Sequence, residues 1–159
     1  MAAHRTPSLD AVAHALSSLA DRSKLWVAVS ALRAAREGRR GRLLALRALV
    51  VVALESALIH VVVKPAFQRT RPTVEVPLRF GARRPPSSSF PSGHAASATT
   101  AALLLANGDP VWAPALSGLA AAVAWSRVET GLHHTTDAVA GMALGVGFGL
   151  VARRFLPVG

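Results

Sequence analysis

The sequence predicts an all-α protein: a helical bundle embedded in a membrane, with about five to six helices, four or five of them spanning. Composition is the first reason, because 52% of the residues are hydrophobic, only 16% are charged and the mean hydropathy is +0.39. A typical soluble domain has about a quarter charged residues. Pattern is the second, because apolar stretches of helical length alternate with polar turns. The length suits one domain over 1–159, with N-terminal helices at 8–36 and a core at 43–152.

The first expected helix covers 8–20 and is amphipathic, because apolar residues recur in it at spacings of three and four. We expect it to lie on the membrane surface or to pack on the bundle. A second helix at 22–36 leads into a basic turn with five arginines, Arg33, Arg36, Arg39, Arg40 and Arg42. A nucleic-acid patch is one interpretation of this turn. The positive-inside bias of loops between apolar helices favours a cytoplasmic loop.

The net charge of +10 points to an anionic partner: lipid head groups, phosphate substrates or nucleic acid. The chain has no tyrosine and only 5% aromatic residues, so a base-stacking surface is poorly provided for. We therefore expect no nucleic-acid partner. The chain also has no cysteine, which excludes disulfides and thiolate metal sites.

The longest apolar run covers 43–63, about the length needed to cross a bilayer. Arg47, Glu55 and His60 interrupt it. Polar groups within a membrane helix face the bundle interior or mark function. For Glu55 and His60 we favour a structural contact inside the bundle over catalysis.

Residues 64–92 form the one long segment without an apolar helix. Six prolines rule out a regular helix there, and basic residues far outnumber its single acid, Glu75. Long loops of this kind are usually functional or disordered.

Three more helices are expected at 94–106, 111–126 and 137–152. They are short for membrane spans, so a soluble helical bundle remains an alternative. The last of them carries Gly141, Gly145 and Gly149 at four-residue spacing. Such a ridge permits close helix packing in lipid, whereas it weakens a helix in water, so it favours the membrane.

Placing the 33–42 arginines in the cytoplasm gives a consistent multi-pass topology in the cell membrane. The 43–63 helix then delivers the long loop to the extracytoplasmic side, and the following helices return Arg153 and Arg154 to the cytoplasm. Three polar clusters gather on the outer face. They are Lys64-x6-Arg71-Pro72, Pro91-Ser92-Gly93-His94, and Ser126-Arg127-x5-His133-x3-Asp137.

Each cluster has an ordinary structural explanation on its own. The basic residues could anchor head groups, Ser92 could cap a helix, and Asp137 could cap the last helix. Three cations, two histidines and a carboxylate on one face together suit phosphoryl transfer, which depends on positioning and on stabilising negative charge. A helix start such as Ser92-Gly93-His94 also favours phosphate. Scattered acids offer no obvious cage for a divalent metal, so we expect no metal and no cofactor.

In order and spacing, these clusters resemble the signature of the type-2 phosphatidic acid phosphatase superfamily, which also includes the vanadium haloperoxidases. The resemblance extends from Lys64 to Asp137. It implies a helical bundle and a metal-independent phosphatase that works through a phosphohistidine intermediate.

The resemblance also implies roles for single residues. His133 would be the nucleophile, Asp137 the carboxylate that orients it, and His94 the general acid and then base. Phosphate would be bound by the side chains of Lys64, Arg71 and Arg127, supplemented by Ser92 and the amide of Gly93.

The sequence departs from the family pattern after His133, where many relatives have an aromatic residue and proline but His134 and Thr135 stand here. We expect His134 to be structural. The leading function is an integral membrane lipid phosphatase that acts on a lipid phosphate or a polyprenyl (di)phosphate. A vanadate-dependent haloperoxidase and a non-catalytic protein that binds anionic lipid are the alternatives. The sequence leaves open which lipid is hydrolysed and whether the chain forms a homo-oligomer.

Overall fold

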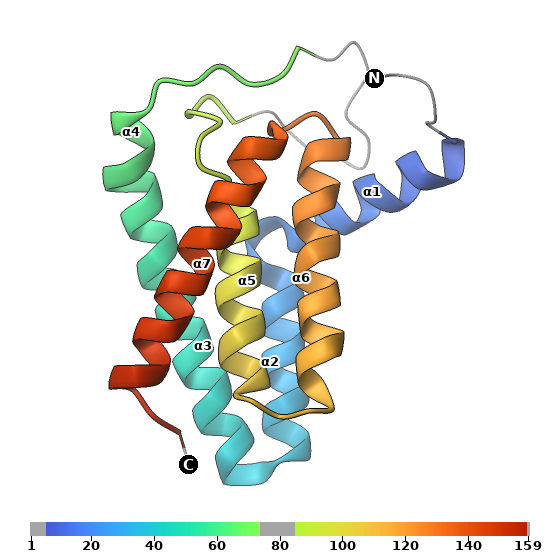
Figure 1. The fold of residues 1–159 in the computed structure, drawn as a ribbon. Coiled ribbons are helices and arrows are strands. Elements are labelled where there is room, and N and C mark those ends of the chain that lie inside the picture. Colours follow the sequence, from blue (N-terminus) through green and yellow to red (C-terminus); the bar gives the residue numbers. More distant parts are fainter. Residues whose placement is uncertain (1–5, 74–84, 159) are drawn as a thin grey trace.

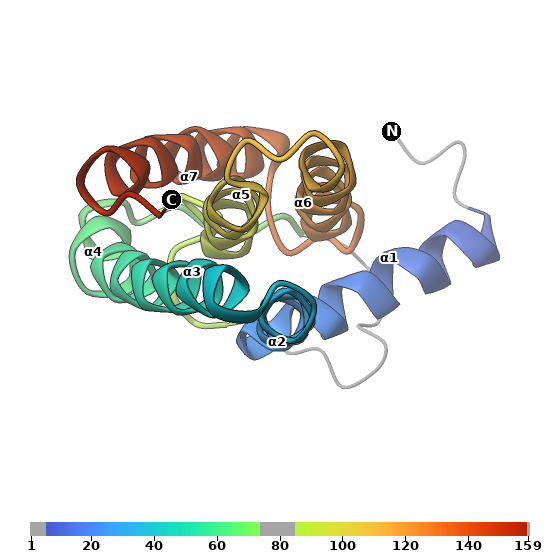
Figure 2. The ribbon, with the colours of Figure 1, turned by 90° about the horizontal axis from the view of Figure 1, so that it is seen from below.

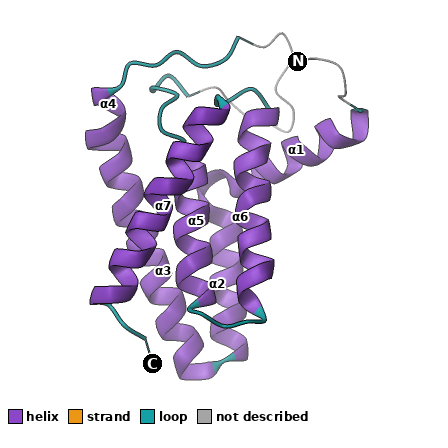
Figure 3. Cartoon of the chain, viewed as in Figure 1, coloured by secondary structure: helices purple, strands orange, loops and turns teal. Residues whose placement is uncertain are grey.

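The computed structural model describes residues 6–73 and 85–158, and within these ranges the chain is helical with no strand (Figure 3). The helices are α1 (Pro7–Ala20), α2 (Lys24–Arg36), α3 (Gly38–Leu58), α4 (Lys64–Ala66), α5 (Gly93–Ala106), α6 (Trp112–Glu129) and α7 (Thr135–Phe155). A 3₁₀ turn, Asp21–Ser23, joins α1 to α2, and a π-helical segment, Ile59–Val63, joins α3 to α4. The prediction of an all-α bundle is therefore confirmed. Part of the predicted 64–92 loop, including Arg79, Arg83 and Arg84, lies outside the described residues.

Helix α3, the π-helical segment and α4 form one continuous helix, Gly38–Ala66. It is longer than the predicted 43–63 because the arginines at its start extend the helix instead of forming a loop. Gly38 separates it from α2 by adopting a left-handed conformation with φ of 55°, which glycine adopts without steric cost. The basic turn is thus very short, and part of the predicted arginine cluster is helical.

Helix α5 is the centre of the bundle, and α2, α3, α6 and α7 surround it (Figures 1 and 2). Its sequence of small residues, GHAASATTAALLLA, allows these neighbours to approach closely. Glycines on α7 complete the fit, because a Cβ atom at Gly141 or Gly145 would collide with the backbone carbonyl of Ser92 or Ala96. Helix α1 lies at a steep angle to the bundle and packs on α6 (Figure 1).

The interior of the bundle holds charged groups. Arg33 donates a hydrogen bond to the carbonyl of Leu105 at 2.6 Å, and Arg47 donates to the carbonyl of Leu104 at 2.9 Å. Both arginines thereby satisfy carbonyls at the end of α5, which have no partner within the helix. Glu55 is fully buried and accepts a hydrogen bond from Thr100, as an interior structural contact requires.

The outer faces are apolar instead. Leu54 and Val61 on the long helix are 65% and 73% exposed, and Val139 and Val151 on α7 are 60% and 58% exposed. Among the described residues, two helices are long and apolar enough to cross a membrane, Gly38–Ala66 and Thr135–Phe155. Charged groups inside and apolar groups outside are the arrangement expected of a bundle surrounded by lipid.

Candidate active site

The predicted site residues lie at one end of the bundle. There α4 ends, α5 and α7 begin and α6 ends (Figure 1). The starts of α5 and α7 are joined directly, because the backbone N–H of Ser92 donates to the carbonyl of Asp137 at 2.9 Å. Ser92 is fully buried and also caps α5, since its hydroxyl accepts from the N–H of Ala95. This contact brings the second and third sequence clusters together.

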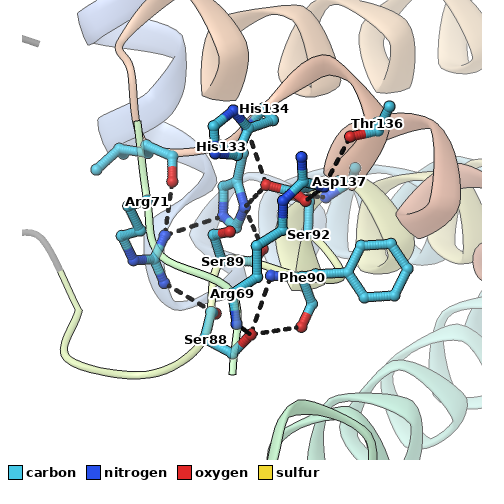
Figure 4. Close-up of polar contacts among 12 residues, drawn as sticks. Arg69, Arg71, Ser88, Ser89, Phe90, Ser92, His133, His134, Thr136 and Asp137 are labelled. Carbon is cyan, nitrogen blue, oxygen red and sulfur yellow. Dashed lines mark hydrogen bonds and ion pairs between the residues drawn. The ribbon is translucent and has the colours of Figure 1, made fainter. Parts of the chain in front are cut away.

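His133 has a fixed orientation (Figure 4). Its Nδ1 lies 2.7 Å from the carbonyl oxygen of Ser89. Because a carbonyl only accepts hydrogen bonds, Nδ1 carries the proton. Nε2 is then the basic nitrogen, and it faces NH1 of Arg71 at 3.4 Å. The residue predicted to be a nucleophile therefore presents an unprotonated nitrogen to a predicted phosphate-binding arginine.

The electrostatic surroundings of His133 keep its ring neutral. Burial, followed by the positive charges of Arg71, Arg127 and Lys64, lowers the pKa of His133 to about 2. The imidazole is thus uncharged at neutral pH. Only an uncharged imidazole has the lone pair that a nucleophile needs.

Asp137 has different contacts from those the sequence predicts. Its Oδ2 lies 3.8 Å from Nδ1 of His133, beyond hydrogen-bond distance, and accepts from the N–H of His134 at 2.8 Å. Its Oδ1 accepts from Arg69 at 2.7 Å. The carboxylate therefore caps α7 and pairs with Arg69, while the Ser89 carbonyl makes the hydrogen bond to the His133 ring (Figure 4). His134 is the N-cap residue of α7, in line with the structural role expected for it.

Two predicted phosphate-binding cations line a groove of about 670 Å³. Lys64 donates to the carbonyl of Ser88 at 2.7 Å, and Arg71 donates to the carbonyl of Leu132 at 2.7 Å. Arg69 lies in the same groove. These contacts hold the loop before α5 against the loop before α7, so the same side chains that would bind phosphate also shape the site.

Arg127 and His94 both contact a carboxylate that the sequence did not indicate. Asp21, in the turn between α1 and α2, has its Oδ1 3.2 Å from NH1 of Arg127 and 3.1 Å from Nε2 of His94. Arg127 is only 2% exposed and also donates to the hydroxyl of Ser17 at 2.6 Å.

Sequence reasoning missed four contributors to the site: Ser17, Asp21, Arg69 and Ser89. Ser89 contributes its backbone carbonyl, and such a contact cannot be predicted from the type of side chain. Arg69 lies between Lys64 and Arg71. Its place in this basic loop is the one feature of the sequence that points to a role at the site. In the described part of the chain, no three histidine or acidic side chains are placed to hold a metal ion.

The fold and the site together define a class: a helical membrane protein in which several cationic side chains gather around a buried, neutral histidine at one end of the bundle. The comparisons with known proteins agree. The family model described as PAP2 superfamily matches residues 44–158. The chain belongs to the PAP2 superfamily, and it is a phosphoric ester hydrolase of the membrane phosphatase kind.

Several relatives are phosphatases. The chain is 40% identical over 131 residues to the decaprenylphosphoryl-5-phosphoribose phosphatase of Mycolicibacterium smegmatis, a match that covers 81% of this chain and 69% of that protein. The enzyme of the same name from Mycobacterium tuberculosis H37Rv is 34% identical over 93 residues, which cover 58% of this chain and 51% of that one. The chain thus matches about half the length of the latter.

Two solved structures share the fold. A transmembrane PAP2-type phosphatidylglycerolphosphate phosphatase from Bacillus subtilis aligns with a TM-score of 0.69 and 28% identity, over 95% of this chain and 78% of that one. LpxE of Aquifex aeolicus aligns with a TM-score of 0.74 and 23% identity, over 95% and 88% of the two chains. The transmembrane neighbour from Bacillus subtilis and the two apolar helices place the protein in a membrane.

Proposed function

We propose that this protein is a metal-independent lipid phosphatase that removes the terminal phosphate of a lipid phosphate or polyprenyl (di)phosphate through a phosphohistidine intermediate. The observation that carries the proposal is the geometry of His133. The carbonyl of Ser89 fixes its proton on Nδ1, and Nε2 faces Arg71 from a buried position. A buried, neutral and oriented imidazole among cations suits attack on an anionic phosphoryl group.

The reaction has two steps. In the first, Nε2 of His133 forms a bond to phosphorus while the bond from phosphorus to the lipid oxygen breaks, and His94 gives its proton to that oxygen. In the second, His94 removes a proton from water, the water oxygen bonds to phosphorus, and the P–N bond to His133 breaks to release inorganic phosphate. Lys64, Arg71 and Arg127 offset the negative charge of the phosphoryl oxygens, with Ser92 and the Gly93 amide adding hydrogen bonds.

An apolar groove supports a substrate with a long hydrocarbon tail. It has a volume of about 620 Å³ and lies between the end of the long helix and α7. Phe67 lines both this groove and the cationic one, so the two are neighbours. Because the Mycolicibacterium relative is a decaprenylphosphoryl-5-phosphoribose phosphatase, we favour a polyprenyl-linked phosphate among the lipid phosphates.

The proposal places the site on the extracytoplasmic side of a multi-pass bundle. The opposite end of the bundle carries basic residues at the α2–α3 turn and at the end of α7, including Arg36, Arg40, Arg153 and Arg154. Under the positive-inside rule, that end faces the cytoplasm.

Phosphate release by the purified protein tests the function. Protein in detergent with EDTA is given a panel of lipid phosphates that includes a polyprenyl-linked sugar phosphate. We expect wild-type turnover in EDTA and its loss in His133→Asn. The matched control is His134→Asn, because asparagine is also a good N-cap residue and retains the cap of α7. Equal turnover in the two variants would contradict the assigned nucleophile, and halide oxidation with added vanadate but no phosphate release would favour a haloperoxidase instead.

A further inference from the structure

The turn between α1 and α2 reaches into the site from a part of the chain that precedes the family match at residues 44–158. Its Asp21 places one oxygen, Oδ1, 3.1 Å from Nε2 of His94 and 3.2 Å from NH1 of Arg127. A single carboxylate thus touches both the proposed general acid and a proposed phosphate-binding arginine.

The position of Asp21 is fixed by the packing of α1 on α6. Ser17, one turn earlier in α1, is fully buried, and its hydroxyl and carbonyl accept hydrogen bonds from NH1 of Arg127 at 2.6 and 3.2 Å. The N–H of Asp21 donates to the carbonyl of Ser18, which ends α1. These contacts hold the backbone of Asp21 and the guanidinium of Arg127 in fixed positions next to each other.

The surroundings of His94 disfavour a positive charge, and burial is the largest of the effects that lower the pKa of this imidazole. His94 stands in the first turn of α5, where the helix dipole is positive. Arg127 of α6 adds a full positive charge. His60 of the long helix and His94 both line a cavity of about 170 Å³. Among the described groups that act on His94, Asp21 supplies the negative charge. The hydrogen bond from His94, with the charge of Arg127, holds the pKa of Asp21 below its usual value, so this carboxyl is ionised at neutral pH.

The hydrogen bonds that Arg127 makes to Asp21 and Ser17 occupy only one side of its guanidinium. NH1 is occupied by Asp21 and Ser17, whereas Nε is buried and has no hydrogen-bond partner in the described part of the chain. A buried donor without a partner is costly. A phosphoryl oxygen of the substrate would supply the missing acceptor while Asp21 holds the opposite side of the guanidinium.

We propose that Asp21 is a positioning residue of the phosphatase reaction, which favours the protonated form of His94 against the burial and the cations around it and fixes Arg127 for phosphate. This inference rests on the proposed function. With the Nε2 proton of His94 held on Asp21, the imidazolium gives its Nδ1 proton to the lipid oxygen as the bond to phosphorus breaks. The neutral ring that remains keeps its hydrogen bond to Asp21 and can take a proton from water in the second step. The N-terminal helices are then part of the catalytic unit.

The test is Asp21→Asn, assayed on a long-chain alkyl phosphate and on p-nitrophenyl phosphate. An alkoxide needs a proton in order to leave, whereas p-nitrophenolate does not. We expect the variant to lose about tenfold or more in kcat on the alkyl phosphate, because a shift of one pKa unit in an acid is a factor of ten, and much less on p-nitrophenyl phosphate. The alkaline limb of its kcat/KM profile should also move to lower pH, since the His94 imidazolium has lost its paired anion.

Asp109→Asn is the matched control, because Asp109 lies at the opposite end of the bundle and also faces a buried arginine, Arg33. It should retain the wild-type profile. A second variant, Ser17→Ala, removes a hydrogen bond to Arg127 without a change of charge. It should raise KM on both substrates and leave the alkaline limb in place, and it keeps the inference testable if Asp21→Asn fails to fold.

Three results for Asp21→Asn would overturn the inference: a wild-type profile, an equal loss on both substrates with no shift in pH, or a rise in kcat/KM. The last would mean that the carboxylate competes with substrate. A lack of turnover by the wild-type protein on every phosphate tested would contradict the proposed function itself. This result differs from a failure of the Asp21 inference, because it is seen without any variant.

Discussion

The side chains at the site are held in place by backbone carbonyls as well as by other side chains. The ring of His133 is held by the carbonyl of Ser89, and Lys64 and Arg71 bind carbonyls of the two flanking loops. Asp137 is fully buried and depends on Arg69 for its charge partner. The orientation of the site therefore depends on Arg69 as well as on the residues proposed for catalysis.

Replacing Arg69 by glutamine tests this dependence. It leaves a buried carboxylate without its charged partner, so we expect the free energy of unfolding to fall by about 1–3 kcal/mol and kcat to fall as the start of α7 shifts. Thermal unfolding in detergent and phosphate release measure the two effects. The control is Arg40→Gln, which removes an exposed ion pair with Glu37 and should cost at most about 1 kcal/mol. Equal effects of the two changes would show that the Arg69 contact contributes nothing special.

At this scale the sequence identifies residues better than it identifies contacts. The spacing of the three clusters correctly brings the second and third together, since Ser92 and Asp137 share a hydrogen bond. It could not reveal that Ser89 holds His133, because any residue at position 89 has a carbonyl. It could not reveal Asp21, because that contact depends on the angle at which α1 crosses α6 (Figure 1).

Among the helices, the contact between α5 and α7 positions the site. Close packing along this contact requires glycine on α7, because a Cβ at Gly145 would collide with the Ala96 carbonyl and lie 2.8 Å from Cβ of Thr99. The same contact, one turn nearer the site, sets Gly141 against the carbonyl of Ser92. A shift of α7 would therefore be passed on to Ser92 and Asp137.

Gly145→Ala should overpack this contact and cost about 1–3 kcal/mol of stability, with a loss of activity as the helices separate. Gly147→Ala is the control in the same helix, because a Cβ there meets no atom within 4 Å. Its melting temperature should stay the same or rise, since alanine favours helix over glycine. Identical melting temperatures for the two variants would contradict the close contact.

The sequence predicted the order and type of these elements because apolar periodicity reports helices reliably. It placed the start of the long helix too late. Arg39, Arg40 and Arg42 looked like a loop, but they form the first turns of a helix that begins at Gly38. The sequence shows the glycine ridge on α7, whereas its partner, the small-residue face of α5, depends on how the helices pack.

The molecule buries several ionisable groups and exposes many apolar side chains on its outer faces, which is the arrangement expected of a bundle in lipid. Arg33, Arg47 and Glu55 are buried, whereas the apolar side chains on the outer faces of the long helix and α7 are exposed. The sequence predicted this membrane character from composition. The number of spans stays a prediction, since two of the described helices meet the length and hydropathy of a span.

A charged substitution on the outer face tests whether this face contacts lipid. Leu54, 65% exposed, lies near the middle of the helix Gly38–Ala66, where a lysine costs about 2.5–3.5 kcal/mol for membrane insertion. Leu54→Lys should therefore lower the yield of membrane-inserted protein. Val111→Lys is the control, because Val111 is 77% exposed in the turn before α6. A yield of Leu54→Lys equal to that of the control would mean that this face does not contact lipid.

Trapping the phosphoenzyme tests the central claim most directly. His94→Asn is mixed with p-nitrophenyl phosphate, which needs no acid to leave, so the first step proceeds while the second is slowed by the loss of the base. The reaction is quenched in alkali, where phosphohistidine survives, and the peptides are analysed by mass spectrometry. We predict a phosphoryl group on His133, and none when His133→Asn is added to the same variant. A phosphoryl group on a serine, or p-nitrophenol release with none on His133, would contradict the mechanism.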